Sequence, residues 1–374
     1  MKKSILALSA IIALTFTSCD SDDDTTPVVP KSTFELVAGN LKGDITDGTV
    51  TLDPNETYTL TGALVVKSGA TLVIPAGTTI KTDADLPSTS LYIAVERDAT
   101  ININGVSGNP VVMTSGKAEP AQSDWGGLVV CGNGIANTGA NGTTEVGGLS
   151  YGGTDNGDSS GKINFLRIEY TGSKFSPEKE FNGVSFFAVG SGTEVSNIYT
   201  YESGDDGIEF FGGAVNASNL AIVNSYDDSL DFADGFAGTL TNVYISGVTK
   251  AGVEGSNNGS NDIADPITNA KINNISIVKG SDAKFTASEQ AINFKEGGGK
   301  QAYTNLFVDG IATACKLDSG SGATARIAAG EFTVTDYQFT ATGADLNGAT
   351  FSGATTATGA SNGAAEPTWL AGIK

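Results

Sequence analysis

The sequence predicts an all-β fold, a right-handed parallel β-helix built as a single solenoid with protruding loops and terminal caps. The first observation is a repeat in which Asn197 is followed by equivalent asparagines, Asn219 after 22 residues and Asn242 after 23 more. The second is that each repeat contains two short runs in which apolar and polar residues alternate. A period of this length with short strands is typical of a chain that winds into stacked coils.

The first strand of each repeat follows the asparagine. Its inward positions are apolar or β-branched, and Ile198, Leu220 and Val243 occupy the same position in three successive repeats. A single coil cannot bury its own apolar face, but stacking places these three residues above one another at about 4.8 Å. The prediction is therefore a core made of columns of like residues, between parallel strands.

The repeat extends in both directions with longer spacings. Phe165 precedes it in the same register, whereas Asn274 and Asn305 continue it. These coils are longer by about nine residues, which predicts an insertion in each. An asparagine at a fixed turn position can hydrogen-bond the backbone and its copy in the next coil. The column of asparagines is therefore interpreted as a structural ladder that fixes the register.

Residues 1–18 are interpreted as a signal peptide. Lys2 and Lys3 precede an apolar run that ends at Phe16 and is too short to span a membrane. The segment before Cys19 resembles a bacterial lipobox, which implies that Cys19 is acylated and becomes the new N-terminus. An ordinary signal peptide with a chance cysteine is the alternative, since Phe16 stands where a smaller residue is usual.

Residues 19–33 are interpreted as a lipidated acidic tether. Asp20 to Asp24 form an acidic run, and prolines follow it without any periodicity. An acidic run directly after a lipidated cysteine resembles the export signal of Bacteroidota lipoproteins. The resemblance implies a lipid-anchored protein on the exterior of the cell outer membrane. A solvated linker that faces the periplasm is the alternative.

Residues 34–374 are expected to form the β-helix domain. Residues 49–81 contain alternating valine, leucine and isoleucine between Ser-Gly-Ala and Pro-Ala-Gly turns, which predicts the first coils. Residues 132–161 are rich in glycine, asparagine and threonine, which predicts a long loop over the coils. The open ends of a solenoid need covering, and the candidate caps are Phe34–Leu60 and Trp369–Leu370.

Three segments carry a resemblance to a known family. TSGKAEPAQSDWGGLVVCGN, INFLRIEYTG and ESGDDGIEFFGGAVNASNLAIVNSYDDSLDFADGF are similar to secreted β-helix proteins of Bacteroidota and marine proteobacteria. The likeness covers residues 50–315 and is most specific in DWGG and DDGIEFFGG. Phe210 and Phe232 stand where that family often has tryptophan. The family has no settled activity, so the resemblance implies the fold and the location alone.

Composition excludes several classes of function. The formal net charge of −21, which becomes −23 without Lys2 and Lys3, opposes binding to nucleic acid and to anionic membrane surfaces. The chain contains no histidine, which excludes histidine-dependent catalytic triads and histidine metal sites. Cys131 and Cys315 remain after lipidation of Cys19. A disulfide between them and two buried thiols are both compatible with the sequence.

A candidate ligand site follows from counting residues after each asparagine. Pairs of aspartates stand eight and nine residues after Asn197 and Asn219, and a lysine stands eight after Asn242. The insertions at residues 172–181 and 280–290 fall in the same arc of the neighbouring coils, which predicts two loops around a recessed floor. The residues of this floor are Asp205, Asp206, Asp227, Asp228 and Lys250.

A second acidic column is predicted beside that floor. Glu209, Asp231 and Glu254 stand at the same outward position of successive coils. Carboxylates about 5 Å apart repel by about 3 kcal/mol at an effective dielectric constant of 20, so they ionise reluctantly, move into water or bind a cation. Calcium suits such an oxygen-rich site. The alternative is that the acids are solvated turn residues that bind no metal.

The preferred interpretation is a non-catalytic binding or structural module that presents a rigid surface to a glycan, a partner protein or the extracellular matrix. The outward residues Tyr199, Tyr201 and Tyr244 are candidates for stacking on sugars. The alternative is a calcium-assisted polysaccharide lyase or glycoside hydrolase that uses the acidic cleft. A lyase needs a base, for which Lys250, Lys174 and Lys295 are the nearby candidates. No catalytic residue is assigned.

Overall fold

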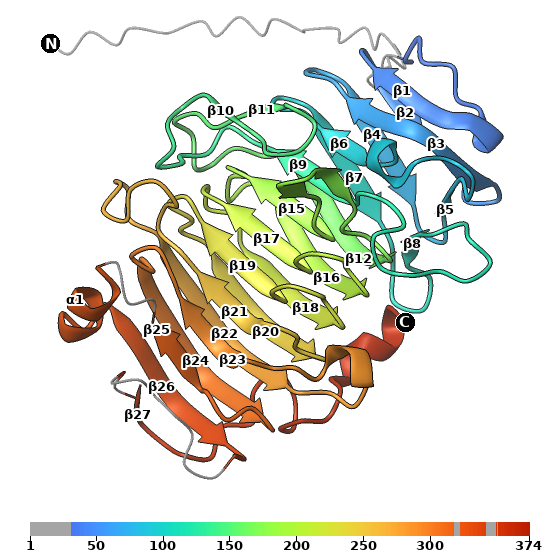
Figure 1. Ribbon diagram of the computed structural model, residues 1–374. Helices are drawn as coiled ribbons and strands as arrows, with labels where there is room; N and C mark the ends of the chain where they lie inside the picture. The colour runs from blue at the N-terminus through green and yellow to red at the C-terminus, as the bar shows by residue number, and fades with distance from the viewer. Residues whose placement is uncertain (1–30, 318–321, 342–348, 350) are drawn as a thin grey trace, which may run out of the picture.

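The computed structural model describes residues 31–317, 322–341, 349 and 351–374. The signal peptide, Cys19 and most of the 19–33 tether lie outside the described residues. No helix in the described part of the chain has the length and apolar character needed to span a membrane. The strands stack as the parallel rungs of one solenoid, which confirms the predicted β-helix (Figure 1).

One face of the solenoid is a ladder of parallel strands that begins near the N-terminus and runs through the centre of the repeat. Its strands are β1 (Leu41–Ile45), β3 (Thr57–Val66), β6 (Ile93–Val95), β9 (Leu128–Cys131), β15 (Val184–Phe187), β17 (Ile208–Phe211), β19 (Leu230–Ala233), β21 (Ala251–Gly255), β23 (Gln290–Phe294) and β25 (Cys315–Leu317).

A second ladder carries the asparagine repeat. Its strands are β2 (Thr49–Thr51), β4 (Thr71–Pro75), β7 (Thr100–Asn104), β12 (Gly161–Glu169), β16 (Glu194–Tyr201), β18 (Ala217–Val223), β20 (Thr239–Ser246), β22 (Asn269–Val278), β24 (Lys300–Asp309), β26 (Phe332–Phe339) and β27 (Phe351–Ser352). In the N-terminal coils two further strands, β5 (Thr79–Thr82) and β8 (Val111–Thr114), form a separate third face between β3 and β12.

The asparagines form the predicted ladder. Asn219 donates from Nδ2 to Oδ1 of Asn197 at 2.9 Å, and Asn242 donates to Asn219 at 2.9 Å. Each adopts a left-handed backbone conformation, with φ of 56° at Asn197, 55° at Asn219 and 58° at Asn242. Asparagine tolerates this conformation better than most residues. It therefore bends each strand at one point and links that bend to the next coil.

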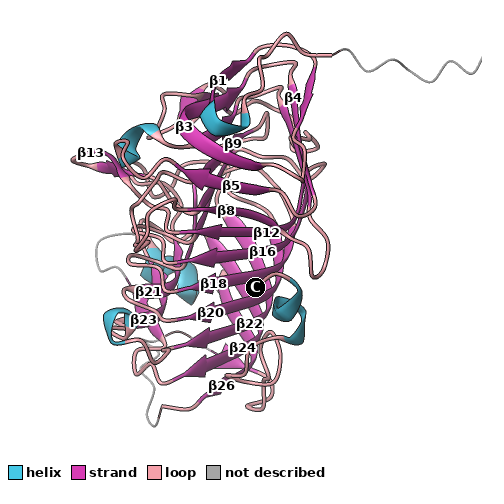
Figure 2. Cartoon of the chain, turned by 90° about the vertical axis from the view of Figure 1, so that its right-hand side faces the viewer, coloured by secondary structure: helices cyan, strands magenta, loops and turns pink. Residues whose placement is uncertain are grey.

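The core consists of stacked columns, as the repeat predicts. Ile198, Leu220 and Val243 are register partners in successive strands and are completely buried. Aromatic side chains form a second column, in which the rings of Phe186 and Phe210 stack with centroids 5.0 Å apart. Figure 2 shows these rungs following one another along the whole length of the molecule.

The ends of the solenoid are covered differently from the prediction. Phe34 packs against the core at the N-terminal end, where the short helix η1 (Ala38–Asn40) also lies. At the other end Ala323 and Ile327, which belong to helix α1 (Ala323–Ala328), pack against the core. The prediction that Trp369–Leu370 caps an end is wrong.

The C-terminal segment instead lies along the side of the solenoid. Its helix η4 (Thr368–Gly372) contacts β16 and β18, and Figure 2 shows the C-terminus beside the middle rungs. The side chains of Leu370 and Ile373 are buried against Tyr199 of β16 and Tyr244 of β20. Apolar residues at the end of the chain therefore cover an aromatic surface in the middle of the solenoid.

The predicted long loop, residues 132–161, lies over the first ladder and contains the hairpin β10 (Gly142–Thr143) and β11 (Ser150–Tyr151). The first predicted insertion, residues 172–181, contains the hairpin of β13 (Lys174–Ser176) and β14 (Lys179–Glu180), and the second, residues 280–290, contains the short helix η3 (Ala283–Phe285). A further short helix, η2 (Ser88–Ser90), lies in the N-terminal coils. Cys131 is a free, buried thiol, so the structure has no disulfide between Cys131 and Cys315. Burial raises the pKa of the Cys131 thiol.

Candidate functional site

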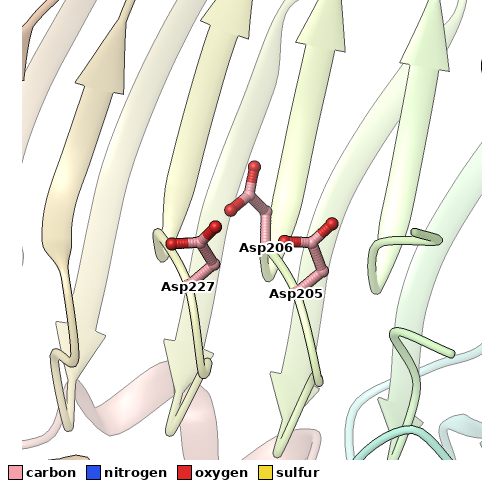
Figure 3. A group of neighbouring side chains, drawn as sticks. All are labelled: Asp205, Asp206 and Asp227. Carbon is pink, nitrogen blue, oxygen red and sulfur yellow. The ribbon is translucent and has the colours of Figure 1, made fainter. Parts of the chain in front are cut away.

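The aspartate pairs stack at the turns that precede β17 and β19. Asp205 and Asp206 come from one turn and Asp227 from the next, and one carboxylate oxygen of each lies within 4.8 Å of the others. Figure 3 shows the three carboxylates gathered at the ends of adjacent strands. The repeat therefore brings together residues 22 positions apart, as the sequence predicts.

The two members of each pair differ in their roles. Asp206 and Asp228 are buried, and each uses Oδ1 to accept a backbone N–H from the next coil. Asp228 donates to Asp206 at 2.9 Å, and Ala251 donates to Asp228 at 2.7 Å. The expectation that all four aspartates line an open floor is therefore wrong for Asp206 and Asp228, which tie the coils together beneath it.

Asp205, Asp227 and Lys250 do line an open pocket of about 650 Å³. Lys250 forms an ion pair with Asp227. Burial, and after it the nearby charge of Asp227, raises the pKa of Asp205 to about 8. Burial therefore disfavours the ionised form of Asp205, whereas Asp227 is paired with Lys250.

The β13–β14 hairpin forms one wall of this pocket, as predicted. Its Lys174 and Glu180 line the pocket and pair with each other at 2.6 Å. The second insertion does not line the same pocket. It contributes Lys284 and Glu289 to two smaller depressions, of about 300 and 280 Å³.

The three depressions are adjacent, because they share lining residues. Lys250 lines both the main pocket and the depression that contains Glu254, Lys295 and Lys316. Tyr226 lines both the main pocket and the depression on its other side. Because the residues of the main pocket and of the depression at Glu254 come from successive rungs, these two form a polar groove roughly 20 Å long that runs along the solenoid axis. We call it the acidic groove.

Tyr226 is the aromatic residue that the sequence analysis missed. It is 55% exposed and lies in the turn directly before Asp227. Its position in a polar turn could have indicated an exposed ring, because the turn residues around it do not belong to the core. Tyr199 and Tyr244, by contrast, are only 5% and 3% exposed because the C-terminal segment covers them. The prediction that these two stack on sugars is therefore wrong.

Tyr201 is half-buried and lies outside the acidic groove. Its ring packs edge-on against Tyr170 with centroids 5.7 Å apart and stacks on Tyr199 at 6.1 Å. Burial raises the pKa of Tyr201 to about 12, and a hydrogen bond with Glu202 acts in the same direction. Its ring is thus engaged by neighbouring aromatic residues of the chain.

The second acidic column forms in the predicted register. Glu209 is the register partner of Asp231, and Asp231 is the register partner of Glu254, in consecutive strands of the first ladder. All three point away from the core, but they are at most 9% exposed. The 132–161 loop packs over this face of the ladder through Tyr151, which contacts Phe187. The alternative in which these acids are solvated turn residues is therefore wrong.

The lysines near the groove are held in their charged form. Burial lowers the pKa of Lys250, but the hydrogen bond and the charge of Asp227 outweigh this and raise it. At Lys295 burial alone would lower the pKa, but the charge and the hydrogen bond of Glu254, together with other nearby acids, outweigh it and raise the pKa. The hydrogen bond with Glu180 raises the pKa of Lys174. A protonated lysine cannot accept a proton, so none of the three suits the base of an elimination reaction.

Solved structures with a similar chain path include two enzymes and a tailspike protein. An alginate lyase from Paenibacillus sp. str. FPU-7 has 12% identity and a TM-score of 0.37, with 77% of this chain and 92% of that chain covered. The Dettilon tailspike protein has 12% identity and a TM-score of 0.36, with 82% and 61% covered. An α-1,3-glucanase from Streptomyces thermodiastaticus strain HF3-3 has 14% identity and a TM-score of 0.32, with 87% and 69% covered.

No curated protein sequence matches this chain. The sequence does match the pectate-lyase-like β-helix domain over residues 43–374. This match begins at β1 and includes every later coil and the C-terminal segment. The chain therefore belongs to the pectate-lyase-like β-helix domain family.

Proposed function

We propose that this protein is a polysaccharide-binding β-helix that holds an extended glycan in the acidic groove. The observation that carries the proposal is the line of polar side chains from Tyr226 to Lys316, which successive rungs place along the solenoid axis. An extended ligand can contact several rungs at once, because equivalent residues recur at each step of about 4.8 Å. The membership in a pectate-lyase-like family supports the choice of a polysaccharide.

The groove combines the chemical groups that sugar recognition needs. Asp227 and Glu180 offer carboxylate acceptors, while Gln122 offers an amide and Lys250 a cationic donor. The exposed ring of Tyr226 offers an apolar face beside these polar groups. The lysines Lys295 and Lys316 at one end of the groove add positive charge to a strongly acidic protein. They favour glycans that carry carboxylate groups.

The proposed location is the outer face of the cell outer membrane, with a lipid on Cys19 as the anchor. Two features of the sequence support this proposal, namely the lipobox-like segment before Cys19 and the acidic run at residues 20–24. Metabolic labelling with a radioactive fatty acid tests the anchor. Incorporation into the wild-type protein and its loss in Cys19→Ala are expected, whereas equal labelling of both proteins contradicts the anchor.

Glycoside hydrolysis is the second candidate function, because the groove contains two neighbouring carboxyl groups in different environments, Asp205 largely buried and Asp227 paired with Lys250. Asp205 has a pKa raised to about 8, first by burial and then by the charge of Asp227. It can donate a proton to a glycosidic oxygen, while Asp227 acts as the nucleophile, because an oxygen of each carboxyl group lies within 4.8 Å of the other and leaves no room for a water between them. The protonated lysines disfavour the alternative of a lyase.

One experiment separates the two candidates. A panel of neutral and uronate-containing polysaccharides is tested for binding and for the release of reducing ends or unsaturated products. Binding without product is the expected result for the wild-type protein. Product that disappears in both Asp205→Asn and Asp227→Asn but persists in Glu56→Gln, an exposed acid far along the chain, establishes hydrolysis instead.

A further inference from the structure

We propose that the depression on the far side of Tyr226 from the acidic groove binds a neutral sugar that branches from the glycan in the groove. This depression has a volume of about 300 Å³ and is lined by Ala121, Gln122, Glu202, Tyr226 and Lys284. We call it the lateral pocket. This inference rests on the proposed function, because a branch sugar is held there only beside a main chain in the groove. It narrows the ligand class to branched polysaccharides.

The lateral pocket lies beside the groove and not in line with it. Glu202 directly follows β16 of the second ladder, whereas Asp205 of the main pocket stands farther along the same turn, nearer to β17 of the first ladder. Because the strands run across the solenoid axis, an earlier position in the turn is displaced sideways, toward the second ladder. A polysaccharide that follows the axis therefore passes the lateral pocket, and a sugar attached to its side reaches into it.

Two residues connect the lateral pocket with the groove. Tyr226 and Gln122 line both the lateral pocket and the main pocket. The turn that carries Tyr226 is fixed, because its backbone N–H donates to the carbonyl oxygen of Ser203 in the preceding coil at 3.0 Å. The largely exposed ring of Tyr226 therefore stands at the boundary and offers apolar surface to a sugar on either side.

Polar groups of the lateral pocket are not engaged within the protein. Among the residues that the structure describes, the ammonium group of Lys284 forms no ion pair, and the side-chain amide of Gln122 has no hydrogen-bond partner. In the main pocket, by contrast, Lys250 is paired with Asp227. Lys284 and Gln122 can therefore bind a ligand without the loss of an existing contact.

The charges of the lateral pocket favour a neutral sugar. Its lining contains one acid, Glu202, and one base, Lys284, so these charges cancel. A carboxylate oxygen accepts hydrogen bonds, an ammonium group donates them, and the amide of Gln122 does both. Sugar hydroxyls also donate and accept, so they match this set. A carboxylate on the branch would instead be repelled by Glu202.

The walls of the lateral pocket are held in place before any ligand binds. Oδ1 of Asp282 accepts the backbone N–H of Lys284 at 3.0 Å, and the completely buried ring of Phe285 anchors η3. In the wall formed by the N-terminal coils, the backbone N–H of Ala121 donates to Oδ2 of Asp124 at 3.0 Å. A pocket whose walls are already ordered binds with a smaller loss of entropy.

Matched pairs of oligosaccharides test the lateral pocket. Mannan, xylan, glucan and galacturonan oligosaccharides of equal backbone length, with and without one neutral side sugar, are titrated into the wild-type protein by calorimetry. At least one branched member is expected to bind about tenfold more tightly than its unbranched partner. Equal affinity within every pair that binds overturns the lateral pocket and leaves the proposed function standing. Absence of binding to every member contradicts both.

Two variants locate the branch sugar. Lys284→Ala, and Ala121→Leu, which fills part of the lateral pocket without touching the groove, are each expected to lower the affinity for the branched ligand to that of its unbranched partner. The affinity for the unbranched ligand is expected to stay unchanged. Lys271→Ala is the matched control, since Lys271 is an exposed lysine of β22 in the same coil as Lys284. A preference for the branched ligand that survives either pocket variant, or that is lost in Lys271→Ala, contradicts this site.

Discussion

The backbone N–H of Asp228 donates to Oδ1 of Asp206 at 2.9 Å, although the two residues are 22 positions apart. Ala251 repeats the contact with Asp228 at 2.7 Å. The two aspartates of each pair thus have different roles. The second, Asp206 or Asp228, hydrogen-bonds the backbone of the next coil, and the first, Asp205 or Asp227, faces the groove. The groove keeps its shape because the residues beneath it are part of the backbone hydrogen-bond network.

The asparagine ladder is expected to stabilise the register. Asn219→Ala removes a bond to Asn197 and one from Asn242, and places alanine at φ of 55°. We expect the free energy of unfolding to fall by about 2–4 kcal/mol, of which about 1 kcal/mol is backbone strain. Urea unfolding measures the change. Asn219→Gly is the control, because glycine loses the ladder without strain; equal costs for both variants would contradict the strain component.

Tyr226 and Tyr244 are expected to respond to substitution in opposite ways. Tyr226→Ala removes a largely exposed ring from the groove, so it is expected to weaken glycan binding at least tenfold and leave the melting temperature unchanged. Tyr244→Ala removes a buried ring and is expected to destabilise the protein by about 3 kcal/mol. Binding and melting assays on the same preparations measure both. Loss of binding only in a folded Tyr244→Ala protein argues against the groove.

Stability in EDTA is expected to decrease as the pH rises. Burial raises the pKa of Asp205 and of Asp228 from the ordinary 3.8 to about 8 in the folded state. Between about pH 4 and pH 8 the folded protein therefore holds protons that the unfolded chain has released. The free energy of unfolding is expected to fall as the pH rises through this range. Melting curves across this window measure the slope. Asp205→Asn is expected to reduce it, whereas a stability that increases with pH contradicts the assignment.

The C-terminal segment is expected to stabilise the middle of the solenoid. Deletion of residues 367–374 removes Leu370 and Ile373 from Tyr199 and Tyr244. We expect a loss of about 2–4 kcal/mol in the free energy of unfolding and more exposed tyrosine in solvent-perturbation spectra. Lys374→Ala, which removes only a cation 5.7 Å from the Tyr199 ring, is the control and should cost less than about 1 kcal/mol. A deletion without effect shows that the segment is dispensable.

The fold and the register were predictable because they depend on a periodic signal. Ile198, Leu220 and Val243 recur at fixed spacing, and stacking follows from burial of one face. The same period placed Asp205 beside Asp227 and Lys250. Each of these contacts joins equivalent positions of neighbouring coils.

Contacts outside the period were not predictable. The C-terminal return to Tyr199 and Tyr244 joins segments more than 100 residues apart and follows no repeat. Alternation also showed that Asp231 points outward, but it gave no indication that a loop from residues 132–161 covers this face. Whether an outward acid meets water or is buried depends on such coverage, which local sequence does not encode.

The most direct test of the account is affinity electrophoresis of the wild-type protein and the Asp205→Asn/Asp227→Asn double variant in gels that contain defined polysaccharides. Mobility is compared with that in gels without glycan, so that the change in charge cancels. The account predicts that at least one polysaccharide retards the wild-type protein and that the double variant, shown to be folded by its melting curve, is not retarded. Equal retardation of both folded proteins, or none for the wild-type protein in any gel, would contradict it.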